Sequence, residues 1–180
     1  MAEHKQPATI ELRVENISQL FDTLDPFPFP ERDLDSDAEE FIVGWARELP
    51  HDDPIKLIIH VAAPASEKES RLIPDSLNRY FEYRAGIISR DLNELFRIGR
   101  IALLIGLSVL ALCLAAAQFT ARRIGDTPLG GFIQQSLIIL GWVANWKPIE
   151  TFLYDWWPLV RRRNLYRRLA QASVELRHYG

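Results

Sequence analysis

A run of seventeen residues without a charged side chain, Ile101 to Ala117, constrains the fold of this chain more than any other stretch. As an α-helix, the wider segment Ile98 to Phe119 spans roughly 33 Å at about 1.5 Å per residue, enough for a hydrocarbon core of about 30 Å. The alternative is a buried core helix of a soluble protein. It is disfavoured because a chain of 180 residues has too little other apolar mass to surround such a helix. We therefore expect a first transmembrane helix over residues 98–120.

A second, weaker apolar run follows from Pro128 to Trp146 and predicts a second transmembrane helix over residues 128–147. The connection between the two runs is so short that they must form an antiparallel helical hairpin. Small residues allow helices to approach closely in a membrane, and amides there usually face a neighbouring helix. The candidate helix-packing residues are Ala102, Gly106, Gln134, Gln135, Gly141 and Asn145.

Charge divides the chain into two unlike parts. Residues 1–96 hold ten Lys/Arg and twenty Asp/Glu, whereas residues 97–180 hold eleven Lys/Arg and four Asp/Glu. The acidic part argues against a nucleic-acid partner, since phosphate contacts need clustered positive charge. The basic part flanks the apolar runs, so anionic lipid headgroups near the C-terminal arginines are the expected partner. No cleavable signal peptide is recognisable at the N-terminus, so the first span is expected to act as its own targeting signal.

The distribution of Lys and Arg around the spans predicts their orientation. Two arginines, Arg122 and Arg123, lie between the spans, and larger numbers flank the hairpin on both outer sides. By the positive-inside rule both termini are cytoplasmic, in a two-span protein of a bacterial inner membrane.

The first part, residues 1–73, reads as an acidic cytoplasmic α/β domain. Residues 9–15 and 55–61 have strand patterns, and a helix over about residues 37–49 lies between them, which implies a parallel pair of strands. Ser36 and Glu39 form a capping-box pattern at the start of this helix. The apolar residues of this helix fall on one face, and they are Ala38, Phe41, Ile42, Trp45 and Leu49. A juxtamembrane stalk helix is expected over residues 74–97, beginning near Pro74.

Residues 148–180 are expected to form interfacial basic helices followed by a strand. The alternation of Ser173 to His178 predicts this strand, which either rejoins the N-terminal sheet or leaves an edge for another subunit. The predicted fold class is therefore α+β, a small α/β cytoplasmic domain with a two- to three-stranded sheet, plus an antiparallel transmembrane helical hairpin.

Three groups of side chains are candidate sites. Phe27 and Phe29 lie in a proline-rich stretch that leaves them to dock on a partner. Five acidic residues between Asp33 and Glu40 could suggest cation binding, but the dipole of the following helix explains them better. A polar network at the membrane interface is predicted to fix the helix position rather than to handle ions, and its members are Lys147, Glu150, Asp155, Arg161, Arg162 and Arg163.

The segment from Gly141 to Pro158, GWVANWKPIETFLYDWWP, is followed by an arginine-rich LYRRL. It resembles a WxPxExFLYDWWP-like segment of uncharacterised bacterial two-span membrane proteins. The resemblance implies the architecture and an inner-membrane location, and it implies no activity.

No catalytic, metal-binding or cofactor-binding motif is present, so we expect no enzyme activity, no metal and no cofactor. The preferred interpretation is a membrane scaffold, an accessory subunit of a larger complex, or a homo-oligomeric assembly unit. The alternatives are a membrane-tethered regulator that senses a ligand or partner, and an oligomeric pore or transport component lined by Gln134, Gln135 and Asn145. The identity of the partners and the stoichiometry are not predicted.

Overall fold

The structure is a computed structural model that describes residues 8–22, 32–50, 53–62, 67–124 and 127–179. The chain divides into two compact units. The first unit consists of Met1–Ile88 together with Arg161–Gly180, and the second consists of Ser89–Val160. The first unit is thus built from the two ends of the chain, and the second is inserted between them.

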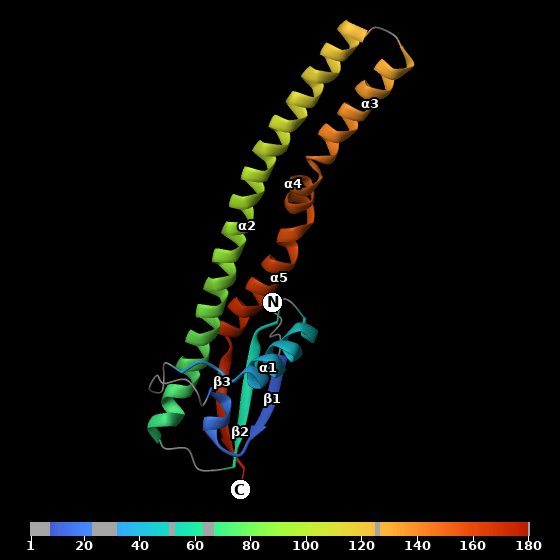
Figure 1. Cartoon of the computed structure of the whole chain (residues 1–180). Coiled ribbons are helices and arrows are strands. Elements are labelled where there is room, and N and C mark those ends of the chain that lie inside the picture. Colours follow the sequence, from blue (N-terminus) through green and yellow to red (C-terminus); the bar gives the residue numbers. More distant parts are fainter. Residues whose placement is uncertain (1–7, 23–31, 51–52, 63–66, 125–126, 180) are drawn as a thin grey trace, which may run out of the picture. The chain divides into compact units, whose positions relative to one another are not determined.

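The first unit combines a small sheet with helices. Its elements are β1 (Ala8–Val14), a short 3₁₀ helix η1 (Ile17–Leu20), α1 (Ser36–Glu48), β2 (Ile55–Val61), the first part of α2 (Glu67–Ile124), the last part of α5 (Trp156–Ala170) and β3 (Ser173–His178). The three strands are parallel and their order is β1-β2-β3, so β2 is central (Figure 1). The parallel pair of strands, expected from the sequence, is confirmed. The last strand pairs within the chain, which decides between the two alternatives above.

Alternation along the strands places one set of apolar residues in the core. In β1, Ile10 and Leu12 are buried, and in β2 nearly every residue is buried. Helices α1, α2 and α5 contribute much of the remaining core of the first unit. Their buried side chains are Ile42, Val43 and Ala46 from α1, Ile73, Leu77, Phe81, Ala85 and Ile88 from α2, and Tyr166 and Leu169 from α5.

The start and the buried face of α1 differ from the expectation. The N-cap is Asp35, not Ser36, because the Asp35 carboxylate accepts hydrogen bonds from the backbone N–H groups of Asp37 (3.0 Å) and Ala38 (3.4 Å). The helix turns Ile42, Val43 and Ala46 inward and leaves Phe41 and Trp45 44% and 52% exposed. The apolar face indicated by the sequence therefore differs from the buried face, because Phe41 and Trp45 lie outside the core.

Helix α2 begins at Glu67, seven residues before the expected start at Pro74. Glu, Lys, Arg and Leu in the sequence Glu67 to Ile73 favour a helix, and they extend it on the N-terminal side of the proline. Pro74 consequently lies inside α2 and not in its first turn. Residues up to Ile88, which the sequence suggested as part of a stalk, belong to the first compact unit.

The second unit contains the rest of α2, then α3 (Pro128–Val143), α4 (Trp146–Glu150), a π-helix η2 (Thr151–Asp155) and the start of α5. Thr127 caps α3, since its hydroxyl accepts a hydrogen bond from the Gly130 N–H at 3.1 Å. The second apolar helix ends at Val143 rather than at residue 147, because a turn at residues 144 and 145 interrupts it. Among the described residues, α2 is the one helix long and apolar enough to cross a membrane, and the qualifying stretch is Ser70–Arg123.

Candidate functional sites

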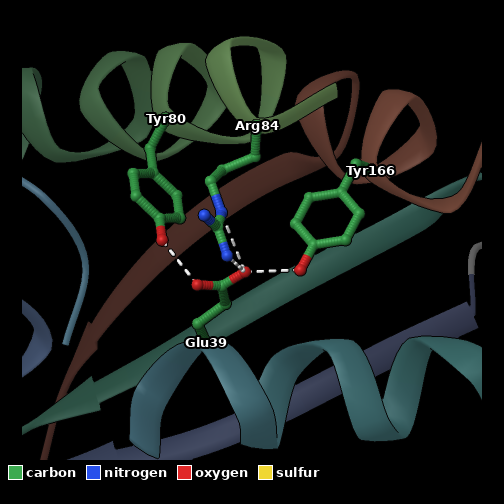
Figure 2. A network of polar contacts seen from close by, with 4 residues as sticks. All are labelled: Glu39, Tyr80, Arg84 and Tyr166. Carbon is green, nitrogen blue, oxygen red and sulfur yellow. Dashed lines mark hydrogen bonds and ion pairs between the residues drawn. The ribbon is translucent and has the colours of Figure 1, made fainter. Parts of the chain in front are cut away.

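The carboxylate of Glu39 on α1 is the centre of a cluster of hydrogen bonds in the first unit (Figure 2). Its Oε2 accepts a hydrogen bond from the Tyr80 hydroxyl at 2.6 Å. Its Oε1 accepts from Arg84 Nε at 3.2 Å, from Arg84 Nη2 at 3.0 Å and from the Tyr166 hydroxyl. Tyr80 and Arg84 are one helical turn apart on α2, and Tyr166 lies on α5. One carboxylate therefore joins three helices that come from distant parts of the sequence.

Each partner in this cluster stabilises one protonation state. Burial by itself raises the pKa of Glu39, but hydrogen bonds from Tyr166, Tyr80 and Arg84 together lower its pKa below the ordinary value of 4.5. Burial and the hydrogen bond to Glu39 raise the pKa values of Tyr80 and Tyr166. Near neutral pH, Glu39 is thus an ionised acceptor and both phenols are protonated donors. All three groups are engaged in structural hydrogen bonds, which suits holding the helices together rather than proton transfer.

The lowered pKa of Glu39 predicts a loss of stability in acid. A carboxylate whose pKa is lower in the folded state stabilises the fold above its unfolded pKa, and that stabilisation is lost as the pH falls through the folded value. We expect the first unit to lose stability as the pH falls below about 4.5 and through the lower folded value of Glu39. In the Glu39→Gln variant this part of the acid sensitivity disappears. Urea unfolding of both proteins between pH 3 and pH 7, roughly the range in which carboxylates titrate, measures the difference.

The sequence offered only part of the evidence for this cluster. The sequence pattern places Glu39 in a capping box with Ser36, but the N-cap is Asp35 and the Glu39 side chain forms no capping box. The available signal was its position three residues before Ile42, which puts Glu39 on the buried side of α1. A charged residue on a buried face needs partners. Tyr80 and Arg84, spaced by four on one face of a second helix, could have been proposed for that role.

The structure brings several of the predicted helix-packing residues together in the second unit. Asn145 is buried, and its side-chain Nδ2 donates to the carbonyl oxygens of Gly106 (3.0 Å) and Gly141 (2.9 Å). A Cβ atom on Gly106 would lie 2.7 Å from Asn145 Oδ1, so this contact requires glycine. Ala102 and Gln134 are half-buried, and Gln135 is exposed. Asn145 therefore lies in the contact between α2 and the end of α3.

Three members of the predicted interfacial network meet at the π-helix η2. Lys147 Nζ lies 3.2 Å from Glu150 Oε2 and 3.4 Å from Asp155 Oδ2. The Thr151 hydroxyl donates to the same Asp155 oxygen at 3.1 Å. The wider turn of a π-helix is a frequent feature of functional sites. The other three predicted members, Arg161, Arg162 and Arg163, belong to the first unit.

The outer face of the sheet carries exposed charged pairs. Lys56 Nζ lies 2.5 Å from Glu175 Oε2, and Arg177 Nε donates to Glu175 Oε1 at 2.8 Å. These two hydrogen-bonded cations lower the pKa of Glu175 to about 2. Because the pairs face solvent, they contribute little to stability.

Phe27 and Phe29, the candidate docking residues, lie outside the described residues. Over the part of the chain that the structure describes, no group of three or more His, Cys, Asp and Glu side chains could hold a metal ion. Searches with protein-family models, among curated proteins and among solved structures each found no match to this chain.

Proposed function

We propose that this chain is a small integral membrane protein without catalytic activity that serves as a scaffold, an accessory subunit or a homo-oligomeric assembly unit. Two spans, a helix over residues 98–120 and a return segment over residues 128–147 that contains α3, would form an antiparallel hairpin. The hairpin would display the α+β domain on the cytoplasmic side of a bacterial inner membrane, as the resemblance of residues 141–158 also implies.

The observation that supports this proposal most is the pairing of β3 with β2. The two strands lie on opposite sides of the second unit in the sequence, yet they can pair only in the same aqueous compartment. If α2 crosses the bilayer, the chain must therefore cross back before residue 173. The apolar segment that contains α3 is the candidate for the return crossing. The 16 residues of α3 span about 24 Å, so residues that follow α3 would complete the crossing of a core of about 30 Å.

Exposure of the apolar helix supports a lipid environment. Only 17% of an apolar 18-residue window of α2 is buried, whereas the core helix of a soluble protein would be mostly buried. Large apolar side chains also stay exposed on α3, where Leu129 and Phe132 are 65% and 71% exposed. Exposed apolar surface of this extent is typical of a membrane or a protein contact.

Exposed aromatic residues after α3 support an interfacial position for residues 142–157. Trp142, Trp146, Tyr154 and Trp157 are each more than half exposed. Tryptophan and tyrosine are enriched where a span meets the headgroups, because their rings are amphipathic. The arginines of α5 follow directly, so this end of the hairpin is expected to face the cytoplasm.

Single-cysteine labelling tests the topology. In a background with Cys113→Ala, Ala121→Cys reports on the connection between the spans, and Gln171→Cys reports on the turn before β3. Both positions are exposed. With a membrane-impermeant maleimide on intact spheroplasts, we expect labelling of Ala121→Cys alone, and labelling of Gln171→Cys only after lysis.

Labelling of both cysteines from the same side would refute the two-span arrangement, and recovery of the chain in the soluble fraction would refute the membrane proposal altogether. The assembly role is tested by the mass of the protein in native nanodiscs. A strictly monomeric protein without a co-purifying partner would contradict it.

A further inference from the structure

The outward face of α1 presents two aromatic side chains among carboxylates. Phe41 and Trp45 are one turn apart, with ring centroids separated by 6.1 Å at an interplanar angle of 51°. They line an open hollow together with Asp37, Glu40, Gly44 and Glu48. A Cβ atom on Gly44 would meet nothing within 4 Å, so the backbone between the rings is accessible. We name these six residues the α1 face.

The chemistry of the α1 face suits guanidinium groups. Aromatic rings attract a cation placed over their faces, and arginine makes such contacts most often. Carboxylates bind the same guanidinium through paired, charge-assisted hydrogen bonds. Three carboxylates beside two exposed rings therefore favour a basic, partly apolar helix, and they disfavour an anionic lipid surface.

The chain itself displays a basic helix surface on α5. On α5, Arg161 and Arg167 are exposed, and so is Asn164 between them, while Tyr166 and Leu169 turn inward. Both α1 and this part of α5 belong to the first unit, so every copy offers both surfaces. We propose that the α1 face binds the exposed arginines of α5 from a second copy. This inference rests on the proposed assembly function and specifies its interface.

A contact between two different surfaces either forms twice across a two-fold axis, which gives a dimer, or is heterologous and closes into a ring or continues as a chain of copies. In a membrane, the shared orientation of all copies permits a ring about the membrane normal. The carboxylates of the α1 face attract the arginines of α5 electrostatically, so assembly should weaken as the salt concentration rises.

A charge swap in the full chain, reconstituted in nanodiscs or detergent, tests the pairing. One variant combines Asp37→Arg, Glu40→Arg and Glu48→Arg, and another combines Arg161→Glu and Arg167→Glu. Each variant is expected to weaken self-association at least about tenfold. The chain with all five substitutions should regain most of the lost affinity, because the opposite charges again face each other. Glu82→Arg, an exposed site on α2, is the matched control and should have no such effect.

An aromatic substitution gives a second readout that leaves the charges unchanged. Trp45→Ala is expected to weaken self-association about tenfold or more, as for a central aromatic anchor of an interface. Tyr83→Ala, at another exposed aromatic residue, serves as its control.

A wild-type oligomer that neither swap nor Trp45→Ala affects would overturn this interface and leave the assembly proposal standing. The interface would also be overturned if the two charge-swap variants lost affinity additively when combined in the five-substitution chain. It would be overturned equally if the variants lost only binding to anionic vesicles and kept their self-association. A wild-type chain that is monomeric at every concentration would overturn this interface. It would overturn the proposed function as well only if no other protein co-purifies with the chain.

Discussion

A chain that ends at Ala172 is expected to lose the fold of its first unit. The truncation removes β3, whose six residues pair with β2 from Lys56 to Val61. The lost pairing removes about five backbone hydrogen bonds. At about 1 kcal/mol net for each of them, this amounts to about 5 kcal/mol. That is comparable to the whole stability of a small domain. Hydrogen exchange of the β2 amides in nanodiscs should therefore accelerate by about a thousandfold or more.

The control for this truncation keeps the strand and removes its charges. Glu175→Gln combined with Arg177→Gln eliminates the exposed ion pairs of β3, which are expected to contribute little. Exchange in β2 should then stay close to that of the wild-type protein. Normal protection of β2 in the truncated chain would show that β3 is dispensable. It would also remove the main support for an even number of membrane crossings.

Replacement of Glu39 by alanine is expected to cause the second largest loss of stability. The substitution leaves the hydroxyls of Tyr80 and Tyr166 and the guanidinium of Arg84 without their common acceptor. Because the Glu39 side chain is only 14% exposed, water replaces it incompletely. We expect the free energy of unfolding of the first unit to fall by about 3 kcal/mol. Exchange of core amides in α1 should accelerate roughly a hundredfold.

Glu40→Ala is the matched control for this variant, since it makes the same chemical change one position along the same helix at an exposed site. We expect it to shift stability by less than about 0.5 kcal/mol. Equal effects of the two substitutions would mean that the Glu39 cluster has no special role. Tyr166→Phe removes one hydrogen-bond donor to Glu39, so its loss of stability should lie between the losses of Glu39→Ala and Glu40→Ala.

Local patterns in the sequence predicted the strands well. The alternation in β1 and β3 and the apolar run of β2 are local signals, and each marks a strand within a residue of its observed bounds. The helix between β1 and β2 made their parallel pairing a topological consequence. The pairing partner of β3 stayed open, because no local signal distinguishes an internal neighbour from an external one.

Side-chain partners across helices were less accessible to prediction. The apolar set indicated for one face of α1 combined Ile42 with the aromatic residues Phe41 and Trp45, and the structure buries Ile42 while it leaves both aromatic residues exposed. Burial of Phe41 and Trp45 would have turned Glu39 away from Tyr80 and Arg84. The rotation of a helix is therefore decided by its polar contacts as well as by its apolar residues. Those contacts depend on distances that sequence spacing does not contain.

The strand order has a consequence for how the protein is made. Because the central strand is synthesised early and its outer neighbour last, the sheet can be completed only after residues 89–160 have left the ribosome. Under the two-span proposal, membrane insertion therefore precedes completion of the domain. A hairpin that failed to return would leave β2 with one open edge, exposed to cellular proteases. Only chains whose membrane segment has inserted with both crossings would complete the sheet and become resistant to these proteases.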